Sequence, residues 1–361
     1  MNHRPAQALT TLLTAFLLYG CIHTAPFRDG QGRIIPGSIG AMETVSIGGI
    51  PQQVWFRGIE TRNPALLILH GGPGASEAAL FRAFNSELEQ HFLVVNWEQR
   101  GTGRSFHSDI PPESMTIAQF LRDLDEVVEL IQKRFNTRCV ILLGHSWGSA
   151  LGTIYAFQHP EKVAAYVGIG QAANMPEGER MSYAYALTQA VAHGNREALD
   201  ALRKIGPPPH TVDDMLISRH WVERFGGSFH TDLSMGKLIW AALNTDEANF
   251  IDLILFGRGN RFSLEHLWRE FSRFDLTIYR TFKMPMFFLL GRYDRQVPAQ
   301  LAASYFETIQ APYKRLIWFE HSAHNPPFEE AETFNRVMIE DVLPIVIGSK
   351  TCVTKPEGHD D

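Results

Sequence analysis

Residues 140–152, VILLGHSWGSALG, constrain the fold of this chain more than any other segment. Four branched apolar residues lead directly into Gly-His-Ser-Trp-Gly, and small residues follow. An apolar run that ends in G-x-S-x-G and continues into a helix is typical of a serine held in a strained strand-to-helix turn. Its neighbours must be glycine, because a Cβ at those positions would collide with the adjacent strand and helix. The pattern therefore predicts Ser146 as a nucleophile at the end of a buried strand.

Further short apolar runs surround this segment, at residues 65–72, 92–101, 163–171, 284–294 and 314–324. Each is apolar along its length, as expected for parallel strands covered on both faces. A helical pattern that starts at Ser114 or Thr116 stands among them. Two alternating segments flank Gly48-Gly49, which predicts a hairpin. Strands alternating with helices predict an α/β fold with a mostly parallel central sheet.

The alternation stops between residues 171 and 283, which are rich in aromatic residues and have helical spacing. That stretch is much longer than an ordinary connection, so we predict a helical cap inserted into a core made of residues 41–170 and 284–348. Residues 22–40 are rich in Gly and Pro and are predicted to be a linker. The polar residues 349–361 are predicted to form a flexible tail.

The first 21 residues have the pattern of an export signal. Arg4 precedes an apolar run over residues 8–19, which is too short for a comfortable membrane span but fits the core of a signal peptide. The run ends in Leu-Tyr-Gly-Cys21, which resembles the site at which bacterial lipoproteins are lipidated. An ordinary signal peptide or an uncleaved anchor is the alternative. We therefore expect an exported protein, anchored to a membrane through Cys21 and facing the periplasm or cell exterior.

Composition excludes several classes of function. The chain has 33 Lys and Arg against 39 Asp and Glu, so it lacks the positive charge of a nucleic-acid-binding protein. Its three cysteines are too few for a disulfide framework, and no cysteine or histidine cluster indicates a metal site. Serine-based hydrolysis needs neither a metal nor an organic cofactor, and we expect none.

A serine hydroxyl is a weak nucleophile and needs a base that is oriented by an acid. In this architecture the order along the chain is serine, acid, histidine. Asp294 follows the apolar run at 286–291, and the segment EHSAH supplies His321 and His324 after the next run. We predict that His324 is the base, because it lies farther into the loop, and that His321 is structural.

The negative oxygen formed during acyl transfer needs two backbone donors. The N–H of Trp147, which follows the nucleophile, is predicted to be one, and Gly72 in the loop HGGPG is predicted to be the other. A simple glycine-rich turn is the alternative for that loop, and a phosphate-binding loop is excluded because no G-K-[ST] follows. The glycines of residues 99–106 lack a nucleotide fingerprint and are interpreted as a structural loop beside the site.

The motifs HGGPG, NWEQRGTGRS, GHSWGS, GRYDRQVP and EHSAHNPPFEE resemble, in this order, those of the proline iminopeptidase branch of the α/β-hydrolase fold. The resemblance covers about residues 40–348. It implies a helical cap after the sixth strand and the triad Ser146, Asp294 and His324. It also implies removal of an amino-terminal residue, often proline, with acidic cap residues that hold the ammonium group of the substrate.

Two motif positions depart from the family pattern: His145 stands where the family commonly has glycine, and Glu98 where it often has aspartate. His145 and the nearby His70 are interpreted as framework residues. No ammonium-binding residue can be transferred through the cap. Glu177, Glu179 and Glu223 are candidates, and for each of them a solvated surface carboxylate is the alternative.

Three functions remain open from the sequence. The first is an aminopeptidase acting on short peptides or amides through an acyl-enzyme. The second is a carboxylesterase or lactonase, for which cap aromatics would line an acyl pocket, namely Trp221, Trp240, Phe250 and Phe256. The third is a non-catalytic binding protein on the same fold. Enzymes of this fold with an aspartate nucleophile are disfavoured, because position 146 is serine. The oligomeric state stays open.

Overall fold

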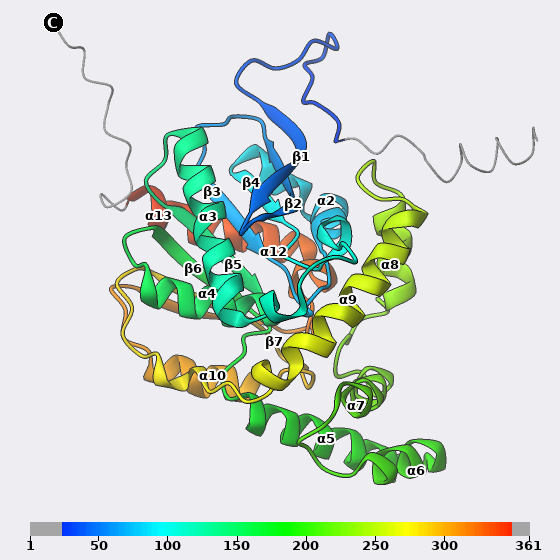
Figure 1. Cartoon of the computed structure of the whole chain (residues 1–361). Helices are drawn as coiled ribbons and strands as arrows, with labels where there is room; N and C mark the ends of the chain where they lie inside the picture. The colour runs from blue at the N-terminus through cyan, green and yellow to red at the C-terminus, as the bar shows by residue number, and fades with distance from the viewer. Residues whose placement is uncertain (1–23, 349–361) are drawn as a thin grey trace, which may run out of the picture.

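The computed structural model describes residues 24–348, built around one eight-stranded sheet with the order β1-β2-β4-β3-β5-β6-β7-β8 (Figure 1). β1 and β2 form an antiparallel hairpin, β2 is antiparallel to β4, and all the other pairings are parallel. The predicted α/β class is confirmed. The strands are β1 (Ile39–Ile47), β2 (Ile50–Gly58), β3 (Ala65–Leu69), β4 (Leu93–Trp97), β5 (Val140–His145), β6 (Val163–Ile169), β7 (Met286–Gly291) and β8 (Lys314–Phe319).

The inner strands are apolar throughout because both faces of the sheet are covered. Along β5, Leu142 packs into the hydrophobic core on one face, and Ile141 and Leu143 pack into the core on the other. This is the period of two expected for a strand. The helices that cover the sheet are α2 (Ala78–Asn85), α3 (Ile117–Phe135), α4 (Trp147–Gln158), α10 (Ala299–Thr308), α11 (Pro326–Glu329), α12 (Ala331–Val337) and α13 (Leu343–Gly348). Of the two starts predicted for α3, the structure has Thr116, whose side chain accepts from the N–H of Gln119.

Five helices stand between β6 and β7, where the sequence predicts a helical insertion (Figure 1). They are α5 (Met175–Ala192), α6 (Arg196–Ile205), α7 (Val212–Arg224), α8 (Met235–Leu243) and α9 (Phe250–Phe271). α5, α6 and α7 share a small core of their own, which includes Tyr183, Leu202 and Trp221. α8 packs on α2, and α9 packs on the short helix η2 (Gly103–Ser105). The insertion is therefore attached to the body at several places.

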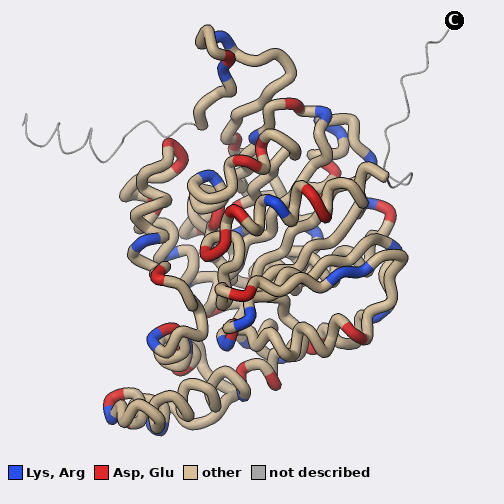
Figure 2. Tube along the Cα trace, turned by 180° about the vertical axis from the view of Figure 1, so that it is seen from behind, with Lys and Arg blue, Asp and Glu red and all other residues tan. Residues whose placement is uncertain are grey.

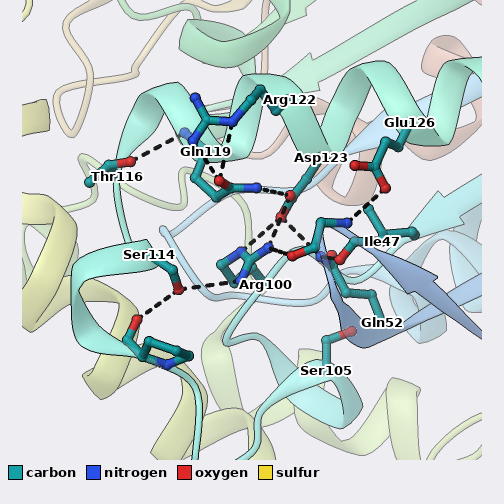
Figure 3. Close-up of polar contacts among 12 residues, drawn as sticks. Ile47, Gln52, Arg100, Ser105, Ser114, Thr116, Gln119, Arg122, Asp123 and Glu126 are labelled. Atoms are coloured by element: carbon teal, nitrogen blue, oxygen red, sulfur yellow. Dashed lines mark hydrogen bonds and ion pairs between the residues drawn. The ribbon is translucent and has the colours of Figure 1, made fainter.

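A buried ion pair between Arg100, in the loop after β4, and Asp123 on α3 is hydrogen-bonded to the β1–β2 hairpin and so joins the hairpin to α3 (Figure 3). Nε and Nη2 of Arg100 lie 2.8 and 3.0 Å from the two carboxylate oxygens of Asp123, and both side chains are almost fully buried. Asp123 also accepts from Gln52 on β2, and Arg100 donates to the carbonyl of Gly48 in the hairpin turn. The loop 99–106 thus has the structural role that the sequence predicts.

The segment before β1, predicted to be a linker, is partly packed against the body. β1 begins at Ile39, within the predicted linker, and Thr24 is buried, with its hydroxyl 2.8 Å from Glu247 in the loop between α8 and α9. Arg57 on β2 reaches the same site, since its Nη1 is 2.9 Å from the carbonyl of Ala25. These contacts join segments far apart in sequence, so local composition could not indicate them. The predictions for residues 1–21, for Cys21 and for residues 349–361 lie outside the described residues.

Candidate active site

Ser146 occupies the strained turn that its sequence context predicts. Its φ of 53° lies in the left-handed region, which non-glycine residues rarely adopt. A Cβ on Gly144 would lie 2.6 Å from the carbonyl oxygen of Gly148, and a Cβ on Gly148 would lie 1.9 Å from that of Leu69. Both glycines are therefore required by the close approach of β5, α4 and β3. The turn holds Ser146 at the carboxyl end of the central strand.

His324 and Asp294 meet in the loops that follow β8 and β7. Nδ1 of His324 is 2.8 Å from Oδ2 of Asp294, and both side chains are buried. Oδ1 of Asp294 accepts from the N–H of Val297, so the carboxylate is held from both sides. Nε2 of His324 has no hydrogen-bond partner. The geometry fixes Nδ1 as the donor to Asp294 and leaves Nε2 able to accept a proton.

Ser146 and His324 line one cavity of about 1250 Å³, counting its open mouth, between the sheet and the cap. Three residues distant in sequence are thus brought to one edge of the sheet, as predicted for Ser146, Asp294 and His324. His321, the alternative base, is exposed, and its backbone N–H donates to Glu330. It is not among the residues that line the cavity.

The two predicted oxyanion donors belong to the turn of the nucleophile and to the glycine-rich loop that follows β3. The N–H of Trp147 is in the first turn of α4, where helical N–H groups have no partner within the helix. Gly72 lines the cavity with a φ of 111°, and a Cβ there would lie 2.6 Å from the nitrogen of Gly74. Only glycine fits this backbone, so the loop allows its N–H groups to approach a substrate closely.

The loop at residues 98–105 contacts Trp147, the residue that follows the nucleophile. Gln99 accepts from the indole N–H of Trp147 at 2.8 Å, and its own backbone N–H donates to Nε2 of His70 at 3.2 Å. Nδ1 of His70 in turn donates to the carbonyl of Gly71. Burial lowers the pKa of His70, which keeps the ring neutral. His70 is therefore a framework residue that joins two loops of the site.

His145 forms a buried ion pair with Glu77, a residue that the sequence did not single out. Nδ1 of His145 is 2.6 Å from Oε1 of Glu77, and Nε2 is 3.0 Å from the backbone carbonyl of His324. Both partners are acceptors, so only the doubly protonated ring can donate to both. Burial acts to lower the pKa of His145, but the charge and hydrogen bond of Glu77 outweigh it and raise this pKa.

The His145 ring also packs against the ring of His324, with centroids 5.0 Å apart. It therefore holds the loop that carries the candidate base. A histidine in place of glycine at position 145 indicates a side chain that needs polar partners, but no local pattern identifies Glu77 as one of them.

The cap contacts the same loops. The carbonyl of Ser228 accepts from the backbone N–H of His324 and from the side chain of Asn325. The carbonyl of Gly227 accepts from the N–H of Arg295, next to Asp294. The segment between α7 and α8 thus helps to position both the acid and the base.

The three cap glutamates have different surroundings. Glu179 is paired with Arg219, and Glu177 is paired with Arg180 at the surface. Glu223 lines the cavity that contains Ser146. Of the predicted ammonium-binding candidates, Glu223 is therefore the one that lines the cavity, and its side chain is also exposed to solvent. Arg219 also lines the cavity, although no sequence pattern indicates this residue.

The aromatic residues expected to line an acyl pocket are only partly at the cavity. Phe256 lines it, whereas Trp221 is packed between α5, α6 and α7. Trp240 and Phe250 are exposed on the surface. The apolar wall of the cavity instead includes Met175, Met215, Leu264, Trp268 and Phe271.

An apolar groove of about 720 Å³, counting its open mouth, lies beside the cavity, between α2, α8 and α9. Buried Glu98 lines it, together with Arg104. Burial raises the pKa of Glu98 to about 7, although hydrogen bonds from Ser76 and from the backbone of Arg104 oppose that shift. The groove and the cavity have several lining residues in common, namely Ser76, Leu80, Met235, Leu238 and Phe256.

Within residues 24–348, no group of three or more His, Cys, Asp and Glu side chains is arranged to hold a metal ion. Over the same residues, no helix combines the length and the hydropathy needed to span a bilayer.

Comparison with known proteins places these features in a family. Residues 64–202 match the family model described as alpha/beta hydrolase fold. The chain is 36% identical over 302 residues to a probable aminopeptidase, YbaC, of Bacillus subtilis, covering 82% of this chain and 94% of that one. It is 26% identical over 316 residues to a proline iminopeptidase of Neisseria gonorrhoeae, covering 83% and 95%. A solved structure of a proline iminopeptidase-related protein from Thermus thermophilus has the same fold, with a TM-score of 0.60, 20% identity and coverage of 86% and 99%.

Proposed function

Because this chain belongs to the α/β-hydrolase superfamily, in its proline iminopeptidase-like branch, we propose that it is a serine aminopeptidase. Its substrates would be small peptides or amides with a free amino terminus, from which it releases the first residue through an acyl-enzyme. One observation carries the proposal: His324 is bound to Asp294 through Nδ1, while its unpartnered Nε2 belongs to a ring that lines the cavity beside Ser146.

The proposed mechanism follows from these positions. His324 takes the proton of the Ser146 hydroxyl through Nε2 while the oxygen attacks the scissile carbonyl carbon. The N–H groups of Trp147 and Gly72 stabilise the negative oxygen of the tetrahedral intermediate. His324 then gives the proton to the leaving amine, and water releases the acyl group by the same steps in reverse order. Asp294 accepts the hydrogen bond from Nδ1, so that Nε2 of the neutral ring faces the reaction, and its charge stabilises the imidazolium that forms.

The substrate class depends on what holds the free amino group. Glu223 is the cavity-lining carboxylate among the cap candidates, and we assign it this role. A charged hydrogen bond between a carboxylate and an ammonium group is among the stronger polar contacts. Peptides with a blocked amino terminus are then poor substrates.

A carboxylesterase or lactonase is the second candidate, and the apolar wall of the cavity favours it. That wall continues into the groove beside Glu98, so an acyl chain would find room there. The two candidates share the same nucleophile and differ in the leaving group. A non-catalytic binding protein is the third candidate.

Covalent labelling tests the nucleophile. A fluorophosphonate probe is expected to label the wild type and not Ser146→Ala, and kcat of His324→Ala is expected to fall by about 10⁴-fold. His321→Ala is the matched control and should keep nearly full activity. An unlabelled wild type would support the non-catalytic alternative, and a loss confined to His321→Ala would move the base to that residue.

Substrate comparison tests the amide assignment. Turnover of proline and alanine β-naphthylamides is expected, and the rates are compared with those of short-chain p-nitrophenyl esters. Rapid ester cleavage with no amide turnover would establish the esterase alternative instead.

We further propose that the protein is exported and is held on a membrane by lipidation at Cys21, facing the periplasm or cell exterior. The support is the positive residue, the apolar run and the cysteine at the amino terminus. Mass analysis of the mature amino terminus tests this, since an unmodified residue 21 would contradict it.

A further inference from the structure

Five large apolar side chains are exposed on α8 and on the first turns of α9. Trp240 is 70% exposed, Phe250 60% and Ile254 61%, and Met235 and Ile239 are also exposed. We call this surface, formed by Met235, Ile239, Trp240, Phe250 and Ile254, the α8–α9 face. Lys237 is the only charged residue of α8. The trace of this helix is accordingly drawn mostly in tan in Figure 2. Several exposed apolar side chains on two helices that line one groove, with one of them a tryptophan, indicate a surface with a partner.

The described chain begins beside this face (Figure 1). Thr24 is fixed by its hydrogen bond to Glu247, in the short loop that separates Trp240 on α8 from Phe250 on α9. Cys21 precedes Thr24 by three residues, which span at most about 11 Å when fully extended. Any membrane attachment of residues 1–21 therefore holds the α8–α9 loop close to the lipid surface.

We infer that the α8–α9 face is seated in the surface of a lipid bilayer. The inference rests on the membrane attachment proposed above and adds an orientation to it. Tryptophan and aliphatic side chains are suited to this position, because a helix can bury such side chains at the boundary between headgroups and acyl chains. The position of Thr24 beside the α8–α9 loop and the exposed apolar residues are independent observations that indicate the same side of the molecule.

The orientation has a consequence for substrates. Met235 and Ile239 belong to the exposed face and also line the groove beside Glu98. The groove shares Leu238 and Phe256 with the cavity that contains Ser146. The mouth of the groove then faces lipid, and amphiphilic molecules in the bilayer have a short route to the nucleophile.

A second copy of the chain is the other occupant that such a face would fit. The bilayer is favoured because the proposed attachment of residues 1–21 would hold the α8–α9 face at the membrane. The membrane would then cover this face, and no second copy of the chain would be needed. Self-association is an outcome that the experiment below distinguishes.

Tryptophan fluorescence tests the inference. The full chain is reconstituted into phosphatidylcholine–phosphatidylglycerol vesicles in which part of the phosphatidylcholine carries brominated acyl chains, which quench tryptophans in contact with lipid. Trp55, Trp97, Trp147, Trp221 and Trp268 are buried, and Trp318 is covered by Arg292 at 3.9 Å. Quenching is therefore expected to come from Trp240, and the quenched fraction should fall by about half or more in Trp240→Phe.

Two variants serve as controls. Val191→Trp, made in the Trp240→Phe background, places a tryptophan on an exposed position of α5. This helix lies at the far end of the molecule from the start of the described chain (Figure 1). This tryptophan should remain unquenched. Phe250→Glu combined with Ile254→Glu should reduce the quenching of Trp240 while leaving hydrolysis of a soluble substrate intact, since neither residue lines the cavity.

Each result decides between the possibilities. Flotation of the protein with vesicles, without quenching of Trp240, would overturn the seated face and leave the membrane attachment standing. Equal quenching of Trp240 and of a tryptophan at position 191 would also overturn it. Failure to float would overturn attachment and seating together. A Trp240-dependent dimer, detected by light scattering of the protein in detergent together with unquenched Trp240, would assign the face to a second copy.

Discussion

His324 illustrates how single residues acquire their roles. One ring nitrogen is held by Asp294, and the other has no partner although it is buried. An unpartnered buried nitrogen is costly, so such groups are rare outside functional sites. The neighbouring His145 has partners on both nitrogens and therefore a structural role. His145 and His324, whose rings are in contact, thus differ in function because their hydrogen-bond partners differ.

Glu223 is the residue whose substitution separates the amide from the ester candidate. Glu223→Gln is expected to raise KM for alanine β-naphthylamide by about ten- to a hundredfold, because a charged hydrogen bond contributes about 1.5–3 kcal/mol. Hydrolysis of p-nitrophenyl acetate, which has no amino group, should change little.

Glu177→Gln is the matched control, since Glu177 is paired with Arg180 at the surface. Steady-state kinetics with both substrates provide the measurement. If Glu223→Gln affects both substrates equally, Glu223 does not hold the ammonium group.

At the scale of elements, the buried pair of Arg100 and Asp123 joins the β1–β2 hairpin to α3 (Figure 3). Removing one partner leaves the other charge buried without compensation. Arg100→Ala is therefore expected to lower the free energy of unfolding by about 3–5 kcal/mol, as measured by urea denaturation.

An exposed pair provides the comparison. Arg62→Ala breaks the contact with Glu60 at the surface and should leave the free energy of unfolding nearly unchanged, because solvent screens an exposed pair. A similar loss in both variants would show that the buried network contributes no more than a surface ion pair.

The cap is also an element that the site requires. Carbonyl groups of Gly227 and Ser228 accept from the backbone next to Asp294 and from His324, so the insertion shapes the loops that carry the acid and the base. Glu329 adds to this, since it accepts from the N–H of His230 in the insertion and from that of Ala323 beside the base. A sequence pattern locates the insertion but not these contacts.

For the molecule as a whole, two buried groups make stability depend on pH in the same direction. Glu98 has a pKa of about 7 in the fold, above that of an ordinary carboxyl, so the folded state binds more protons between pH 4.5 and 7. His145 also has a raised pKa, so its contribution is complete below the usual imidazole range and is lost as the pH rises through the folded value. The stabilisation that these two groups contribute should therefore decline from pH 5 to pH 9, whereas buried His70, whose pKa is lowered, acts in the opposite direction as the pH rises towards the usual imidazole range.

Thermal unfolding measures this decline. Glu98→Gln removes the carboxyl titration, so its free energy of unfolding relative to that of the wild type should increase between pH 5 and 8, by about 1.4 kcal/mol for each unit of pKa shift. The Tm of the variant should rise relative to that of the wild type over the same range. Glu113→Gln, at an exposed position, should follow the wild type at every pH. A constant difference between Glu98→Gln and the wild type would contradict the raised pKa.

The sequence by itself determined the features that depend on neighbours along the chain. The apolar strand before Ser146 and the glycines of its turn are local patterns, and they placed the nucleophile in the correct turn. Asp294 and His324 each follow an apolar run, and their order along the chain placed both in the correct loops. The position of the helical insertion followed in the same way, because a long helical stretch interrupts the alternation of strands and helices.

Only the tertiary structure decided which distant residues meet. It pairs Glu77 with His145 and Thr24 with Glu247, across loops and layers. It also places Glu223, and not Glu179, at the cavity. Nothing in the local sequence specifies them, because a charged side chain has the same local signature whether it faces water, a cavity or a buried partner. Packing of the insertion against the sheet selects among these environments, and it also leaves the α8–α9 face uncovered.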